Sequence, residues 1–536
     1  MRSLWQFLGA LVAATSLGLA QASSSTLGTE DDVATALERH GVYASTVNLL
    51  RSAKNQPTEV ACQTACSSLN SLYGSQVLFP DTTAYNNFTG SFWSVQQEEV
   101  QPRCIFKPSK NTEVSTVVLV SRLTNCPFAA KSGGHAAFAG ASNSPGGITI
   151  WFTDMNEVTL NADKSVASIG PGNVWGAVYE ALEPYGLAVI GGRASSIGVG
   201  GFTTGGGISF YSNLYGWAID NVESFEVVTA SGLIVTATEE EYSDLYWGLR
   251  GGGNNLGLVT KFNLYTIPSP MMRGDTRVFL ETEFDPVINA FVNMAHDAPK
   301  DGNAQYYIAF LSTEGMNIAS AELTYVKNVT NPPIYRQIQS IPAISDSPVA
   351  RTLVQYAEYI DADNPNGLRE VYWPISAYLN EEFAKWTADY FFSVIPQVAN
   401  VAGAQPVLVY QAVTEPMLKN MTKYGGNALG LEASKGPVHL MHVSFWWDDA
   451  SDDETVYSWV GSFWDTVLAK AQDMGIYNEW IYMNYASQFQ NVIAGYGAEN
   501  KARLQQVAAK YDPEGVWQTL QPGYFKLTHA PVAQSP

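Results

Sequence analysis

Four glycine-rich segments constrain the fold of this chain more than any other feature. They are Gly133-Gly134, Gly170-Pro171-Gly172, GGRASSIGVGGFTTGGG at 191–207 and GGGNNLG at 251–257. Glycine weakens regular elements, so a chain uses it in bulk where backbone must approach something closely or where φ must be positive. Consecutive amides without side chains can also bind an anion such as a pyrophosphate. Turns between short strands explain single glycines, but the repetition at 198–207 favours a cofactor cradle.

The common nucleotide-binding motifs are absent. In GxGxxG, Gly198 and Gly200 would be followed by a third glycine, but Thr203 stands there. No GxxxxGK[ST] motif occurs either. The sequence therefore gives no support for a Rossmann or P-loop site, and the cradle must belong to another architecture.

Composition bounds the class of protein. The 536 residues imply two or three domains, and the hydrophobic share of 46% with 15% charged residues suits a well-packed globular protein. A formal charge of −21 argues against a nucleic-acid partner, since such binding neutralises phosphates with Lys and Arg. This net charge does not exclude an anionic cofactor, because backbone amides bind phosphate without formal charge.

The periodicity of apolar residues predicts an α+β chain. A segment at 23–97 with a helix near 59–72 precedes a region at 98–270, where short β-branched runs alternate with glycine turns and with helices at 115–123 and 173–182. Strands at 304–312 and near 436–449 and an amphipathic helix at 453–474 predict a second domain over 271–479, with an antiparallel sheet covered by helices. The segment 480–527 contains YMNYAS and a helix at 500–511.

The N-terminus has the pattern of a secretory signal over residues 1–22. Arg2 precedes an apolar run that ends near Leu19, and cleavage is expected after Ala20 or Ala22. The run is too short for a membrane anchor, and no later segment is apolar for long enough to span a bilayer. Three sequons, at Asn87, Asn328 and Asn420, agree with secretion and predict glycosylation.

The four cysteines, Cys62, Cys66, Cys104 and Cys126, all precede residue 127. An even number in an oxidising compartment suggests disulfides. A zinc site fits poorly, because the paired spacing and clustered histidines of such sites are missing. We therefore expect no metal.

Several segments together resemble a known family. KSGGHAAFAGASN at 131–143, GPGNVWGAVYEAL, the 191–222 segment and LYWGLRGGGNNLGLVTKFNL are similar to the FAD-binding (PCMH-type) domain of the vanillyl-alcohol oxidase and p-cresol methylhydroxylase superfamily. The C-terminal YMNYASQFQ segment resembles the berberine-bridge-enzyme-like branch, in the style of its fungal members. The resemblance implies an FAD-binding domain of two α/β subdomains, formed by 98–270 and completed by 23–97 and the C-terminal segment, plus the substrate domain.

The resemblance also implies roles for particular residues. His135 stands where the family's histidine bonds covalently to the flavin 8α-methyl, and a neutral imidazole is a suitable nucleophile. Cys66 and Cys104 match a family disulfide, while a Cys62–Cys126 pair is left open by the sequence. The residues implied to line FAD are Ser132, Gly133, Gly134, Ala136, Ser196, Gly198, Gly200, Gly201, Gly205, Gly206 and Val259.

One departure from the family pattern is informative. Bicovalent relatives carry a cysteine, bonded to flavin C6, where this chain has Ala194. We therefore expect a single covalent link and a somewhat less oxidising flavin.

A catalytic base must come from the substrate half. We favour Tyr482 of YMNY as the base, with Asn484 positioning cofactor or substrate, on the same face of an expected strand. An ordinary packing role for Tyr482 is the alternative, and His439, His442 and Glu479 are further candidates.

These features predict a monomeric secreted flavoprotein oxidase that transfers hydride from a C–H bond of a small organic substrate to FAD and reduces O₂ to H₂O₂. A secondary-metabolite intermediate is favoured as substrate over an oligosaccharide. An FAD-containing cyclase without net oxidation and a non-catalytic secreted binding glycoprotein stay as alternatives.

Overall fold

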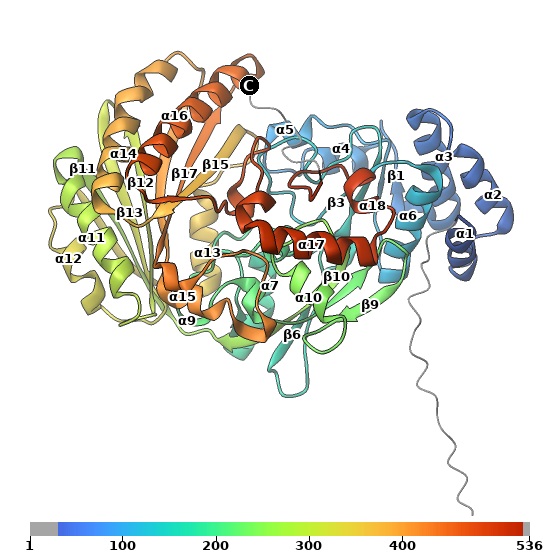
Figure 1. Cartoon of the computed structure of the whole chain (residues 1–536), viewed down its shortest axis with the longest axis horizontal. Coiled ribbons are helices and arrows are strands. Elements are labelled where there is room, and N and C mark those ends of the chain that lie inside the picture. The colour runs from blue at the N-terminus through green and yellow to red at the C-terminus, as the bar shows by residue number, and fades with distance from the viewer. Residues whose placement is uncertain (1–29, 529–536) are drawn as a thin grey trace, which may run out of the picture.

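The computed structural model describes residues 30–528, and the expected signal segment lies outside them (Figure 1). Three β-sheets follow one another along the chain. The first two lie in the half formed mainly by residues 30–268, and the third forms the other half together with its covering helices. The α+β class expected from the sequence is confirmed. Within the described residues, no helix is both long and apolar enough to cross a membrane.

The first sheet has the order β1-β2-β4-β3. Its strands are β1 (Val77–Leu78), β2 (Cys104–Phe106), β4 (Ile148–Trp151) and β3 (Phe128–Lys131), and the last three are mutually parallel. Helices α1 (Glu30–Arg39), α2 (Ala44–Ala53), α3 (Thr58–Tyr73) and α6 (Asn111–Thr124) pack with it in one apolar core. The helices expected at 59–72 and 115–123 are therefore confirmed as α3 and α6.

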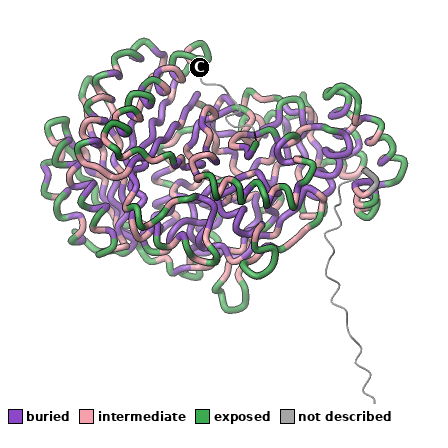
Figure 2. The backbone as a smooth tube through the Cα atoms, viewed as in Figure 1, coloured by how far each residue is buried: buried purple, intermediate pink, exposed green. Residues whose placement is uncertain are grey.

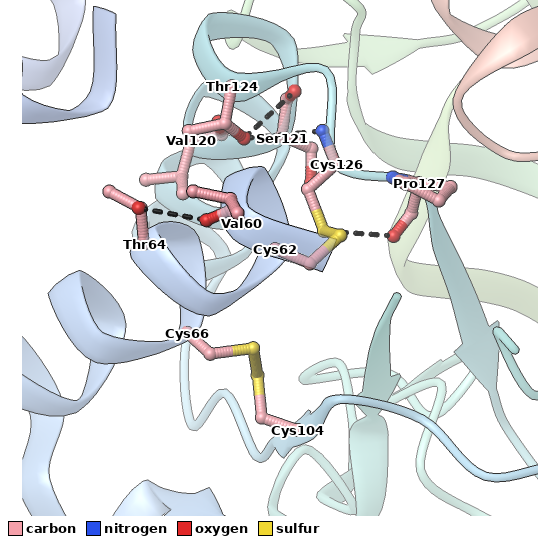
Figure 3. Close-up of a disulfide and its surroundings, with 10 residues drawn as sticks. All are labelled: Val60, Cys62, Thr64, Cys66, Cys104, Val120, Ser121, Thr124, Cys126 and Pro127. Atoms are coloured by element: carbon pink, nitrogen blue, oxygen red, sulfur yellow. Dashed lines mark hydrogen bonds between the residues drawn. A yellow bond between two sulfur atoms is a disulfide. The ribbon is translucent and has the colours of Figure 1, made fainter. Parts of the chain in front are cut away.

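Two disulfides join helix α3 to this sheet (Figure 3). Cys66 is bonded to Cys104 at the start of β2, as the family resemblance implies. Cys62 is bonded to Cys126, in the turn between α6 and β3. All four side chains are fully buried and no cysteine of the described chain is free, so the zinc alternative is excluded for them.

The second sheet is antiparallel and has the order β5-β6-β10-β8-β9, with β7 paired to β10. The strands are β5 (Val158–Leu160), β6 (Val166–Ile169), β7 (Leu187–Val189), β8 (Val222–Val228), β9 (Ile234–Ala237) and β10 (Leu258–Pro268). Helices α7 (Trp175–Leu182), α8 (Val199–Thr204) and α10 (Ser243–Leu249) lie among them. The glycine-rich segments at 170–172 and 251–257 connect these elements, the segment at 191–207 contains α8, and Gly133-Gly134 lies in the loop after β3 of the first sheet.

The third sheet contains eight antiparallel strands in the order β14-β11-β13-β12-β16-β17-β15-β18. They are β11 (Met272–Leu280), β12 (Ala304–Thr313), β13 (Met316–Tyr325), β14 (Ser345–Arg351), β15 (Arg369–Tyr378), β16 (Gln405–Val413), β17 (Val438–Trp447) and β18 (Tyr477–Asn478). Helices α11 (Phe284–Asp297), α14 (Glu381–Val394) and α16 (Asp453–Asp473) cover its outer face (Figure 1). Helix α13 (Leu353–Ala362), which lies between β14 and β15 along the chain, packs against α7 of the other half.

The two faces of this sheet have different neighbours. In β17, Met441, Val443 and Phe445 pack into the core shared with the outer helices, whereas Leu440 packs into the core of the second sheet. Alternation along the strand places His442 on the same face as Leu440. The inner face of the sheet therefore lies toward the glycine-rich half, and buried backbone continues across the junction (Figure 2).

The YMNY segment differs from the sequence prediction. Residues 482–485 are not a strand: β18 ends at Asn478, and Met483–Tyr485 form a short 3-10 turn. The Tyr482 hydroxyl accepts hydrogen bonds from the backbone amides of Gly207 and Ile208, and these bonds hold the segment in its irregular conformation. The chain then continues into α17 (Ala498–Tyr511), the helix expected at 500–511.

Candidate active site

The loop that carries His135 leaves the carboxyl end of β3 and is fixed by residues 93–97. The amide of Trp93 donates to the carbonyl of Gly134 at 3.2 Å. Ser94 Oγ and Gln97 Nε2 both donate to the carbonyl of Ala136, each at 2.8 Å. Because these carbonyls are held on one side, the position of the imidazole is set before any ligand binds.

The His135 ring has the state that a nucleophile needs. It stacks on the indole of Trp93, with ring centroids 4.2 Å apart and planes 19° from parallel. Its Nε2 atom is shielded from solvent and has no hydrogen-bond partner. Burial lowers the pKa of His135 to about 4, so the ring is neutral near pH 7 and keeps a free lone pair.

Three glycine-containing loops meet beside this histidine. Ser132 Oγ donates to the carbonyl of Pro171 at 2.6 Å and accepts from the amide of Gly200 at 3.1 Å. A Cβ on Gly133 would lie 2.5 Å from the amide nitrogen of Gly198, and one on Gly198 would lie 2.1 Å from that of Gly133. These two glycines are required by direct contact between backbones, in addition to any role toward a ligand.

The remaining glycines of the cradle divide into two kinds. A Cβ on Gly201 would meet nothing within 4 Å, and this residue is exposed, so its backbone lines open space. A Cβ on Gly205 would lie 2.0 Å from Asn484 Oδ1, and one on Gly206 would lie 3.1 Å from the Tyr482 ring. Gly201 can thus border a ligand, whereas Gly205 and Gly206 make room for the YMNY segment.

The loop at 194–197 is held from the other half of the chain. Asp361 of α13 accepts hydrogen bonds from Ser195 Oγ at 2.9 Å and from the amide of Ser196 at 3.2 Å. Ala194 is buried in the core of the second sheet, as is Val259 in β10. A carboxylate therefore fixes the loop in which bicovalent relatives have their cysteine.

Tyr482 and Asn484 do lie together, although not on a strand. Tyr482 Oη accepts hydrogen bonds from the amides of Gly207 and Ile208 and from Asn484 Nδ2, at 3.1, 3.0 and 3.0 Å. Burial raises the pKa of Tyr482 and outweighs these donors, so the phenol stays protonated near neutral pH. Its role as a base stays a prediction, and its surroundings suit a brace between YMNY and the glycine run.

A polar cluster around Arg193 was missed by the sequence reasoning. Arg193 Nη2 donates to Gln411 Oε1 at 2.8 Å and to Tyr485 Oη at 2.7 Å, and its Cζ lies 5.5 Å from the centroid of the Tyr307 ring. The residues come from the glycine-rich loop, β16, the YMNY turn and β12. A lone arginine inside GGRASS was the only signal for it in the sequence.

His442 lies on the inner face of the third sheet next to this cluster. Its ring stacks on Tyr372, with centroids 5.4 Å apart, and approaches Tyr485 at 4.7 Å. Burial and the charge of Arg193 lower the pKa of His442 to about 3, so the ring is neutral. The ring centroids of Tyr372 and Trp93 are 5.4 Å apart, so the aromatic residues around His442 are in contact with the loop that carries His135.

The other two candidates lie elsewhere. His439 is on the opposite face of β17, between Phe291 of α11 and Tyr410 of β16, inside the outer core. Glu479 is exposed on the surface. Neither contacts the Arg193 cluster.

Comparisons with known proteins identify the class. Residues 102–238 match a family model described as an FAD binding domain, and residues 481–522 match one described as berberine and berberine like. Two FAD-dependent monooxygenases, tpcD of Cochliobolus heterostrophus and FUP4 of Fusarium proliferatum, are each 32% identical over 87% of this chain and over 94% and 95% of their own lengths.

Solved structures show the same fold at lower identity. Glucooligosaccharide oxidase of Acremonium strictum matches with a TM-score of 0.70 and 20% identity, covering 86% of this chain and 97% of its own. 6-Hydroxy-D-nicotine oxidase of Arthrobacter nicotinovorans matches with a TM-score of 0.69 and 19% identity, covering 83% and 96%.

The site and the comparisons agree on a flavin-dependent oxidoreductase. The neutral, unpartnered His135 nitrogen and the open space beside Gly201 fit a bound FAD. The chain belongs to the berberine-bridge-like family of FAD-dependent oxidoreductases, within the PCMH-type FAD-binding fold.

Proposed function

We propose that this chain is a secreted oxidase that carries FAD on His135 through one covalent bond and oxidises a small organic substrate. The observation that carries the proposal is the His135 ring, which is neutral, has a buried nitrogen without a partner, and lies where the glycine loops meet. The chemistry that bound FAD supplies is acceptance of a hydride from a C–H bond and return of two electrons to O₂, which leaves as H₂O₂.

The protein groups on the substrate side hold and move the proton. Tyr485 Oη accepts from Arg193 Nη2 at 2.7 Å, so the guanidinium lies where it can stabilise the negative charge of a phenolate, the form that accepts a proton and becomes the neutral phenol. We propose Tyr485 as the group that takes the substrate O–H or N–H proton. Tyr482 and Asn484 then position Tyr485 and the glycine run, and the neutral His442 forms part of the wall.

The single covalent link is supported by Ala194, which cannot form a thioether. Glucooligosaccharide oxidase of Acremonium strictum has a 6-S-cysteinyl, 8α-N1-histidyl FAD, with both a cysteine and a histidine bonded. The Asp361 hydrogen bonds to Ser195 and Ser196 offer a non-covalent means of fixing the same loop here.

The first test is acid precipitation of the purified protein. Yellow colour that stays in the pellet, and that His135→Ala moves to the supernatant, supports the covalent link; His296→Ala, an exposed histidine on α11, is the matched control. Proteolysis and mass spectrometry should then give one flavin-bearing peptide, containing His135. A colourless protein would favour the non-catalytic binding glycoprotein, and colour released from wild type would refute the covalent bond alone.

The second test concerns the base. Tyr485→Phe should lower kcat by roughly a hundredfold, as loss of a general base does. Tyr482→Phe should lower flavin occupancy or stability more than kcat, because its Oη organises backbone amides. A large loss of kcat in Tyr482→Phe, with kcat little changed in Tyr485→Phe, would instead assign the base to Tyr482.

For the reaction type, the relatives give a specific second candidate. The proteins that are 32% identical are named monooxygenases, and they come from fungi. We favour an oxidase acting on a secondary-metabolite intermediate over an oligosaccharide, since the carbohydrate oxidases resemble this chain at about 20% identity only. With a substrate in hand, one H₂O₂ per turnover supports the oxidase. Incorporation of ¹⁸O from ¹⁸O₂ indicates a monooxygenase, and turnover without O₂ uptake indicates the cyclase.

A further inference from the structure

Arg193 differs from the other large cations inside this protein. Its Nη1 atom is shielded from solvent and forms no hydrogen bond. An unpaired buried charge costs free energy, and a guanidinium has no neutral form near pH 7 by which to avoid that cost. Such a group is explained if a ligand of opposite charge binds to it in the folded protein.

The buried arginines elsewhere already have such partners. Arg250 lies 3.5 Å from Asp220, and Arg277, Arg369 and Arg122 pair with Asp346, Asp453 and Glu514 respectively. Over residues 30–528, Arg193 forms no comparable ion pair, and its hydrogen-bond partners are the uncharged Gln411 Oε1 and Tyr485 Oη. The contrast lies in the missing acidic partner, since Arg122 and Arg277 also each have a buried Nε without a hydrogen bond.

Aromatic side chains lie beside the Arg193 guanidinium. Tyr307, Tyr372 and Tyr485 are partly exposed, and His442 stacks on Tyr372 and lies tilted against Tyr485. Flat rings on several sides suit a planar, unsaturated body, and the guanidinium suits an anionic oxygen attached to it.

We propose that Arg193 binds a carboxylate of the substrate, so that the enzyme selects an aromatic or conjugated organic acid over its neutral analogue. Nη1 has no partner within the described chain and is the nitrogen left to donate to an anion, while Nη2 is held by Gln411 and Tyr485 and fixes the orientation of the guanidinium. This inference rests on the proposed function, because it takes the surface between the His135 loop and the third sheet as the substrate site.

The test compares a charged and a neutral probe of the same shape. Benzoate and benzamide are titrated into the flavin-containing protein by calorimetry at pH 7. We expect benzoate to bind at least about tenfold more tightly than benzamide to wild type, since hydrogen bonds to charged groups are the stronger ones. This comparison needs no variant.

Variants then assign the preference to one residue. Arg193→Met should reduce benzoate affinity about tenfold and leave benzamide little changed, and Arg193→Lys should restore part of the preference. Arg351→Met is the matched control, because it also removes a guanidinium that lies over a tyrosine ring. Arg351 is on β14, at one edge of the third sheet, and its Cζ lies 4.0 Å from the centroid of the Tyr359 ring. Benzoate and benzamide that do not differ in wild type, or a preference unchanged in Arg193→Met, would overturn the proposal.

Acid precipitation separates this failure from failure of the proposed function. Flavin retained in the pellet together with no difference between benzoate and benzamide refutes the carboxylate partner alone. Loss of the flavin absorbance spectrum in Arg193→Met, with benzoate affinity retained, would assign Arg193 to the cofactor instead.

Discussion

The imidazole of His135 and the indole of Trp93 form a stacked pair, with centroids 4.2 Å apart and planes at 19°. Trp93 also donates its indole N–H to the carbonyl of Asn364 and its backbone amide to Gly134. Hydrogen bonds thus hold both the indole and the main chain of Trp93, and the indole restricts the imidazole to one orientation. Orientation of a nucleophile contributes to the rate of bond formation as its pKa does.

Trp93→Leu should therefore lower the fraction of flavin that is covalently bound, while non-covalent FAD stays in the protein. The reason is that the imidazole keeps its neutral state but loses the surface that orients it. The measurement is flavin absorbance in the acid pellet relative to total flavin, with Trp386→Leu, a substitution on α14 of the other half, as control. Full covalent occupancy in Trp93→Leu would contradict a positioning role.

Gly198 and Gly201 should respond differently to alanine. A Cβ at 198 would overlap the Gly133 backbone, so Gly198→Ala should lower the melting temperature even of flavin-free protein. A Cβ at 201 meets only open space, so Gly201→Ala should leave the flavin-free protein unchanged and lower FAD occupancy. Thermal unfolding with and without added FAD measures both effects; equal destabilisation by the two changes would mean that 201 does not border the cofactor.

Local patterns carried most of the fold prediction. The helices at 59–72, 115–123 and 453–474 were found from the spacing of apolar residues. The glycine loops were found because glycine in bulk has few other uses. Each of these signals lies within about twenty residues of sequence, where periodicity is informative.

The Arg193 cluster could not be found in this way. Arg193 is 218 residues from Gln411 and 292 from Tyr485, and only the packing of the two halves brings them together. The irregular conformation at Tyr482 also comes from long-range contacts, because its hydroxyl accepts hydrogen bonds from amides 274 and 275 residues away. Tertiary contacts of this kind override the local pattern that suggested a strand.

The three sequons should not be glycosylated equally. Asn87 and Asn328 are exposed, whereas Asn420 is half-buried and its Nδ2, the atom that a glycan must occupy, donates to the carbonyl of Pro416 at 2.8 Å. We expect glycans at Asn87 and Asn328 and little at Asn420, as measured by glycopeptide mass spectrometry of secreted protein. Substantial occupancy at Asn420 would show that modification precedes formation of α15 (Glu415–Asn420).

Acid should destabilise the fold through its buried histidines, and His439 tests this away from the active site. Burial lowers the pKa of His439 to about 3, whereas the unfolded chain protonates it near 6.5. Between these values the unfolded state binds one more proton, so stability falls as pH falls, by about 1.4 kcal/mol per pH unit for this group. His439→Leu should remove that contribution and make stability about 2 kcal/mol less sensitive to a change from pH 6.5 to 5.

Neither ring nitrogen of His439 has a hydrogen-bond partner within the described chain, so leucine leaves no donor or acceptor unpaired between Phe291 and Tyr410. Denaturant unfolding at several pH values measures the slope of stability against pH, with His296→Gln, at an exposed histidine, as control. Parallel slopes for wild type and His439→Leu would mean that the protein admits a proton at His439 without unfolding. In that case the acid response would come from His135 and His442, whose pKa values burial lowers to about 4 and about 3, and it would appear as loss of activity before loss of structure.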